Sequence, residues 1–115
     1  MRRDELYLLD MLDAAGAIRD FTQGKSFDDF CENYLLQVGI WKLFEIIGEA
    51  ARKVSAQFKD DHPEIPWRSV RGMRHNLVHE YFRIDLKQVW AAVEEDIPPL
   101  IEQLEPLVPP KPDQT

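Results

Sequence analysis

Residues 34–58 read YLLQVGIWKLFEIIGEAARKVSAQF, and this stretch decides the fold. Its apolar residues recur at three- and four-residue steps and cover most of the circumference of the helix that this spacing predicts. The polar residues fall on one narrow stripe, which consists of Lys42, Glu45, Glu49, Arg52 and Lys53. A helix with so little polar surface lies at the centre of a bundle or is shared with a second subunit. Gly39 and Gly48 lower helix propensity, and a close approach of another helix would explain both.

The same helical periodicity accounts for most of the remaining chain, and no segment alternates as a strand would. Gly24 follows one helix, Ser26 and Asp85 are expected N-caps, and Pro98-Pro99 must interrupt a helix. The expected helices cover residues 5–21, 27–33, 34–58, 66–79, 86–96 and 100–107, with a loop over 59–66. We therefore predict an all-α, four- to five-helix up-and-down bundle. One domain spans residues 1–108, and residues 109–115 form a Pro-rich extended tail.

The chain has 115 residues, of which 44% are hydrophobic and 30% are charged, and this composition is typical of one globular domain. Its single cysteine, Cys31, excludes an internal disulfide framework and suits a reducing compartment. We find no secretory signal and no run of about 18 uncharged apolar residues, so we expect a cytoplasmic protein without membrane contact. The formal net charge of −7 argues against a protein that coats nucleic acid with its whole surface.

Positive charge is concentrated in one segment of this acidic chain. Residues 65–79 read IPWRSVRGMRHNLVH and contain no acid. On a helix that turns 100° per residue, one side carries Arg68, Arg71, His75 and His79. Arg74 instead lies among the apolar residues, about 140° from His79. Because a buried arginine is rare unless it is paired, we expect Arg74 to have a buried acidic partner or to face a cleft or a subunit interface.

Histidine and arginine together suit RNA cleavage by attack of the ribose 2′-OH on the neighbouring phosphate. Histidine exchanges a proton near neutral pH, and arginine stabilises the charge of a phosphorane-like transition state. Two other interpretations stay open on the residues alone. His75 and His79 have the four-residue spacing of a metal pair, although no third ligand is evident nearby. Arginine and histidine on a helix face are also commonly ordinary solvated charges.

Residues 74–81 read RHNLVHEY and resemble the R-x4-H-x-Y motif of HepT-like proteins, in the HEPN superfamily of helical ribonucleases. The flanking segments IGEAARK, PEIPW and FRIDL, at residues 47–53, 63–67 and 82–86, also resemble this family. The resemblance covers nearly the whole chain. It implies a HEPN-like homodimer in which the motifs of both protomers line a shared cleft. RNA would be cleaved there without a metal ion and without another cofactor.

The resemblance also implies a role for each motif residue. His79 would be the general acid/base, and Arg74 would be the ligand of the phosphate and the transition state. The polar residues His75 and Asn76 would support this catalytic pair. Arg68 and Arg71, in the same basic segment, are candidates for RNA binding.

HepT-like proteins are toxins of type II toxin–antitoxin modules. Their antitoxin partner resembles a minimal nucleotidyltransferase (MNT type), which can transfer AMP from ATP to the motif tyrosine, here Tyr81. A bulky, anionic nucleotide beside the cleft would exclude RNA by size and by charge repulsion. An alternative from a different class of function is a non-catalytic HEPN binding module that serves as the substrate or partner subunit of a nucleotidyltransferase. For Tyr81 itself, the other interpretation is plain packing at a helix end.

Overall fold

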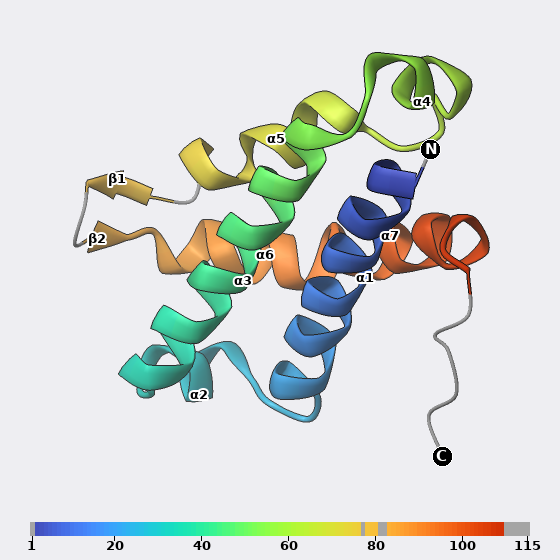
Figure 1. The fold of residues 1–115 in the computed structure, drawn as a ribbon. Coiled ribbons are helices and arrows are strands. Elements are labelled where there is room, and N and C mark those ends of the chain that lie inside the picture. Colours follow the sequence, from blue (N-terminus) through green and yellow to red (C-terminus); the bar gives the residue numbers. More distant parts are fainter. Residues whose placement is uncertain (1, 77, 81–82, 110–115) are drawn as a thin grey trace.

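The structure, a computed structural model, describes residues 2–76, 78–80 and 83–109, with side chains described for residues 3–71 and 85–109. The described elements run in the order α1 (Arg2–Thr22), α2 (Phe27–Cys31), α3 (Tyr34–Lys53), α4 (Ala56–Asp61), α5 (Trp67–Asn76), β1 (Val78–Glu80), β2 (Arg83–Ile84), α6 (Leu86–Glu95), α7 (Ile97–Leu104) and the 3-10 helix η1 (Glu105–Leu107). The prediction of an all-α helical bundle is confirmed, with one short β-hairpin added to it (Figure 1).

The core forms where α1 and α3 lie side by side and where α6 and α7 cross behind them (Figure 1). α5 packs against α3, and α2 reaches α6 through the Phe30 and Trp90 rings, whose centroids lie 5.2 Å apart. The fully buried large side chains come from nearly every helix: Leu8, Met11, Ile18, Phe30, Ile40, Phe44, Ile47, Val70, Val89, Ile97 and Leu104. The central place that the sequence predicts for residues 34–58 is therefore confirmed for α3.

Local capping signals set the helix ends as the sequence predicts. Ser26 accepts a hydrogen bond from the backbone N–H of Asp29, and the Asp29 carboxylate accepts one from the backbone N–H of Ser26, so the two form a capping box. Asp85 caps α6 by accepting from the backbone N–H of Gln88. Gly24 takes the positive φ of +77° that its position after α1 requires. Pro98 and Pro99 lie in the first turn of α7, where the missing N–H groups cost no intrahelical bond, so the helix expected over residues 100–107 instead begins at Ile97 and ends at Leu104.

The expected single helix over residues 34–58 is wrong at its C-terminal end. α3 ends at Lys53, and a new helix, α4, begins at Ala56. Ser55 separates them because its hydroxyl oxygen accepts from the backbone N–H of Phe58, while its own N–H and O–H donate to the Asp4 carboxylate. The loop expected over residues 59–66 consequently begins later, and Lys59 lies in a helix. α2 also ends earlier than expected, at Cys31 rather than at residue 33.

The helix expected over residues 66–79 also ends early, and strands follow it. α5 stops at Asn76, and Val78–Glu80 pairs antiparallel with Arg83–Ile84. β-branched residues such as Val78 and Ile84 favour an extended backbone, and each segment is too short to show alternation in the sequence. The expectation that no strand occurs is therefore wrong for these few residues. The boundary between a domain and a tail at residue 108 stays a prediction, since residues 110–115 lie outside the described part.

None of the described helices combines the length and the apolar composition needed to cross a bilayer. Gly39 is exposed, and a Cβ placed there would meet no described atom within 4 Å apart from its chain neighbours and its own helix backbone. The close helix approach expected at Gly39 is therefore not made within the described part of the chain, whereas Gly48 is buried in α3.

Candidate active site at the end of α5

α5 carries five of the candidate residues: Arg68, Arg71, Arg74, His75 and Asn76. Its start is fixed to the preceding turn. Pro66 precedes the helix, and the Trp67 indole N–H donates to the backbone carbonyl of His62 at 2.9 Å. Val70 is buried in the core, while Arg68 and Arg71 point away from it and are exposed. The sequence thus correctly separates the apolar side of this helix from a basic side, at least over its first half.

The motif residues occupy the far end of α5 and the strand that follows. Arg74, His75 and Asn76 form the last residues of α5, and His79 is the middle residue of β1. The structure describes their backbone positions and not their side chains. Tyr81 lies outside the described residues, so its expected role as an adenylylation site stays a prediction.

The strand position of His79 changes two arguments made from the sequence. His79 is not on the helix that carries Arg74, so the separation of about 140° between them on a helical wheel does not apply. The spacing behind the alternative of a metal pair was also helical, and it is lost because His75 and His79 lie in different elements. Arg74 and His79 lie five positions apart in the sequence, the first near the end of α5 and the second in β1.

The hairpin is irregular at the position of the candidate histidine. Val78 pairs with Ile84 and Glu80 pairs with Arg83, so the register shifts between residues 78 and 80. His79 is the residue at this irregularity. Such bulges bend a strand and change the direction of a side chain, and they are common beside active sites.

A third cation lies next to the basic side of α5, and the sequence analysis did not select it. Lys59, on α4, holds its ammonium 5.8 Å from the centre of the Trp67 ring. Burial lowers the pKa of Lys59, the positive charge of Arg71 lowers it further, and Asp4 opposes these effects. The signal that could have found Lys59 is Ser55, which follows the pattern of an N-cap and predicts a helix across a presumed loop.

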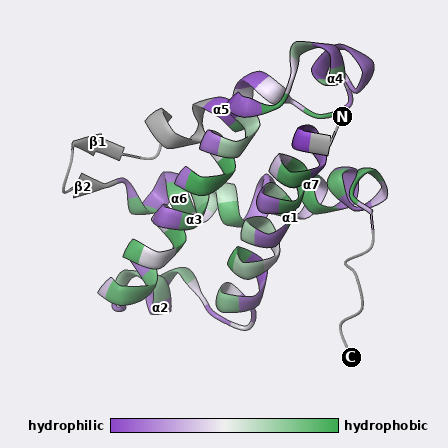
Figure 2. Cartoon of the chain, in the orientation of Figure 1, coloured by the Kyte–Doolittle hydropathy of each residue, from purple (hydrophilic) through white to green (hydrophobic). Residues whose placement is uncertain are grey.

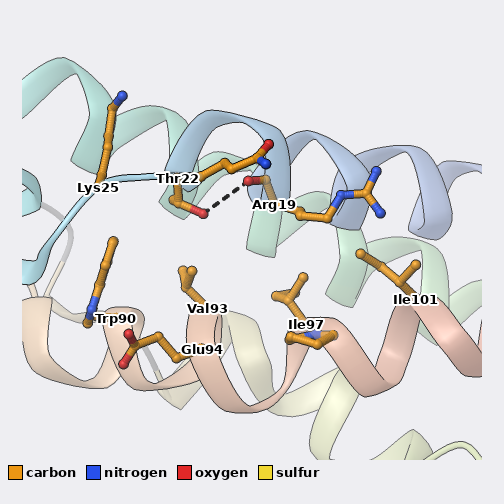
Figure 3. Close-up of a pocket in the computed structure, with 10 residues that line it drawn as sticks. Arg19, Thr22, Lys25, Trp90, Val93, Glu94, Ile97 and Ile101 are labelled. Carbon is orange, nitrogen blue, oxygen red and sulfur yellow. Dashed lines mark hydrogen bonds between the residues drawn. The ribbon is translucent and has the colours of Figure 1, made fainter.

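A groove with both polar and apolar walls lies elsewhere, between α1 and the pair α6 and α7 (Figure 3). Arg19 and Lys25 border it, with Trp90 and Glu94 on the other side. The Thr22 hydroxyl in this groove already donates to the backbone carbonyls of its own helix, at 2.7 Å to Ile18 and 3.3 Å to Arg19. Arg19 also pairs with its neighbour Asp20 at 3.2 Å. This groove contains none of the residues that the sequence selects.

Comparison with known proteins places the same segment inside a family match. The family model described as "Ribonuclease HepT-like" matches residues 11–107, which include α5, the hairpin and most of the bundle. A protein of Thermococcus cleftensis named "Probable ribonuclease HepT" is 42% identical over 101 residues, covering 88% of this chain and 92% of the relative. A relative from Methanocaldococcus jannaschii, whose name describes it as an RNase, is 33% identical, covering 90% of this chain and 96% of its own. No solved structure matches the chain significantly.

Proposed function

Because this chain belongs to the HepT-like ribonuclease family, we propose that it is the toxin of a type II toxin–antitoxin module and cleaves RNA as a metal-independent endoribonuclease. The observation that carries the proposal is the R-x4-H-x-Y sequence at residues 74–81, inside the family match. The proposal is also supported by the short separation of Arg74 and His79, which lie five positions apart at the end of α5 and in β1.

In the proposed reaction the 2′-oxygen of a ribose attacks the adjacent phosphorus, and the bond to the 5′-oxygen of the next nucleotide breaks. His79 takes the proton from the 2′-OH or delivers one to the departing 5′-oxygen, because imidazole does both near neutral pH. Arg74 binds the phosphate oxygens, on which negative charge accumulates in the transition state. His75 and Asn76 support this pair, and the products are a 2′,3′-cyclic phosphate and a 5′-hydroxyl.

The proposed active unit is a homodimer with a composite cleft. It is supported by the amount of apolar surface that one protomer exposes near the start of α3. Tyr34 is 75% exposed and Leu35 is 81% exposed, and Phe21 at the end of α1 is 58% exposed. Leu35 and Phe21 border an apolar groove of about 480 Å³ that also includes Gly39. Apolar surface of this kind is typical of a face that binds another protein, and a second copy is the partner we propose.

The test of catalysis is to replace Arg74 or His79 with alanine in the purified protein. We expect each variant to lose RNA cleavage by at least about 100-fold, because general acid–base catalysis and transition-state charge stabilisation each contribute that much. Arg19→Ala is the matched control, since Arg19 is an exposed arginine in the last turn of α1, at the end of that helix away from α5 (Figure 1). Cleavage by His79→Ala at the wild-type rate would refute the site assignment. Cleavage abolished by EDTA and restored by a divalent metal ion would refute the metal-independent mechanism.

We further propose that a nucleotidyltransferase antitoxin neutralises the toxin by adenylylating Tyr81. Incubation with the cognate antitoxin and ATP should add the mass of one or more AMP units and reduce cleavage, because the anionic nucleotide repels RNA. Tyr81→Phe should accept no AMP while it still cleaves RNA. An unchanged mass with an active antitoxin would contradict this regulation. AMP transfer to a wild-type chain that cleaves no RNA would instead identify a non-catalytic partner subunit.

A further inference from the structure

At the junction of α4 and α5 the chain turns a corner that ring contacts and a hydrogen bond stabilise. The His62 ring stacks on the Phe58 ring with centroids 4.4 Å apart, and the Trp67 ring meets Phe58 edge-on at 6.2 Å. The hydrogen bond from the Trp67 indole to the carbonyl of His62 connects the two helices directly. Asp4 fixes the start of α4 to α1 through Ser55. Side chains on this corner are therefore presented from a pre-organised backbone.

Three cations lie on this corner, and we call Lys59, Arg68 and Arg71 the basic corner. Trp67 and Arg71 are four residues apart on α5 and share a face, and Lys59 lies over the Trp67 ring. Arg71 is close enough to Lys59 to lower its pKa, after the larger effect of burial. The Lys59 ammonium is partly withdrawn from water and is repelled by the like charge of the exposed Arg71, and a bound anion would relieve that repulsion. Figure 2 shows α4 and the start of α5 as mostly hydrophilic.

Two acidic residues near the corner, Asp61 and Glu64, are engaged with other groups. The Asp61 carboxylate accepts from the Gln57 amide at 3.1 Å, and the Glu64 carboxylate contacts Nδ1 of His62 at 3.1 Å. Asp60 is exposed, but it lies about 100° from Lys59 around α4. The carboxylate that acts on Lys59 is Asp4, which the two Ser55 hydrogen bonds already occupy. The corner therefore keeps its positive charge available to solvent.

The basic corner lies at one end of α5 and the motif residues lie at the other. Position 75 is four residues, or about 6 Å of helical rise, beyond Arg71 on the same face of α5. Figure 1 shows α4, α5 and the hairpin following one another along one side of the bundle. A nucleic acid strand that reaches the motif could continue along α5 to the corner. Cations bind the phosphates of such a strand without reading its sequence.

We propose that Lys59 is an RNA-binding residue, which together with Arg68 and Arg71 binds the phosphate backbone of the substrate beside the cleavage site. This inference rests on the proposed ribonuclease function. Trp67 holds the Lys59 ammonium in position, and the aromatic cluster beneath it limits the entropy lost on binding. Lys59 takes no part in the chemical step, so it contributes to substrate affinity and not to the turnover rate.

The test measures binding of a fluorescein-labelled single-stranded RNA whose 2′-hydroxyls are methylated, so that it cannot be cleaved by internal attack. Fluorescence anisotropy is followed over a range of NaCl concentrations. We expect Lys59→Gln to weaken binding about three- to tenfold for two unrelated sequences, and to reduce the salt slope by about 0.7, as for one lost phosphate contact. Lys59→Arg should restore both quantities, since it restores the charge.

Lys25→Gln is the matched control, because Lys25 lies in the turn between α1 and α2, at the opposite end of α1 from α4 (Figure 1). Thermal melting monitored by circular dichroism identifies any variant that is not folded. Affinity and salt slope of Lys59→Gln equal to those of Lys25→Gln would overturn the inference, as would a wild-type protein that does not bind the probe.

Cleavage of unmodified RNA separates the two proposals. We expect Lys59→Gln to raise KM and to leave kcat unchanged. Lys59-dependent binding by a protein that cleaves nothing would contradict the ribonuclease proposal and leave the binding surface intact. Efficient cleavage with an unchanged KM in Lys59→Gln would contradict the binding surface alone.

Discussion

The Asp4 carboxylate, at the first turn of α1, accepts hydrogen bonds from the backbone N–H of Ser55 at 2.9 Å and from its hydroxyl at 2.6 Å. Burial raises the pKa of Asp4, but these hydrogen bonds lower it more, so the net pKa is below the ordinary 3.8. Ionised Asp4 therefore stabilises the fold above about pH 4, and this contribution is lost as the pH falls through the lowered pKa. We predict that Asp4→Asn reduces the free energy of unfolding at pH 7 by about 1–2 kcal/mol.

Urea unfolding of wild type and Asp4→Asn at several pH values measures this effect. The difference between the two proteins should be constant from about pH 6 to 8 and should shrink below about pH 4, where the wild-type carboxylate becomes protonated. Asp10→Asn is the control, because Asp10 is an exposed carboxylate on the same helix. A difference that persists unchanged into acid would show that the Asp4→Asn substitution is unfavourable for a reason other than the lost charge.

At the scale of the element, the sequence predicts those helix ends that a few neighbouring residues determine. The cap at Ser26, the cap at Asp85 and the left-handed Gly24 all follow from side chains within three positions. The basic side of α5 is predictable for Arg68 and Arg71 for the same reason, since helical spacing alone places them together.

The parts that sequence reasoning misses depend on contacts between distant segments. α4 separates from α3 at Ser55, and the partner of Ser55 is Asp4, 51 residues earlier. The hairpin needs β1 and β2 to pair, and neither segment has enough residues for a periodic signal. Lys59 is missed because the sequence analysis places it in a loop, whereas it lies in α4. The roles of Arg74, His75, Asn76, His79 and Tyr81 come from the resemblance to the family and remain predictions.

At the scale of the whole molecule, the proposed dimer should depend on the apolar surface at the start of α3. We predict that Leu35→Glu shifts the protein from dimer to monomer, because burying a carboxylate in an apolar interface costs several kcal/mol. If the cleft is composite, cleavage should fall with the loss of dimer. Analytical ultracentrifugation of the variant and of the wild type measures the shift directly.

Leu6→Glu is the control for this experiment, since Leu6 is 56% exposed on α1 outside that groove. It should leave the association state unchanged. A wild-type protein that sediments as a monomer, or a Leu35→Glu variant that stays a dimer, would contradict the interface at the start of α3.

The hydrogen bond between Trp67 and position 62 has a consequence for how relatives of this protein can diverge. The donor is the Trp67 indole, but the acceptor is a main-chain carbonyl. Any residue at position 62 supplies that oxygen, whereas phenylalanine in place of Trp67 would leave it without this donor. Substitution at position 62 should therefore be neutral for the bond itself, and position 67 should accept few replacements. The constraint is asymmetric, so pairwise covariation between the two positions would not reveal it.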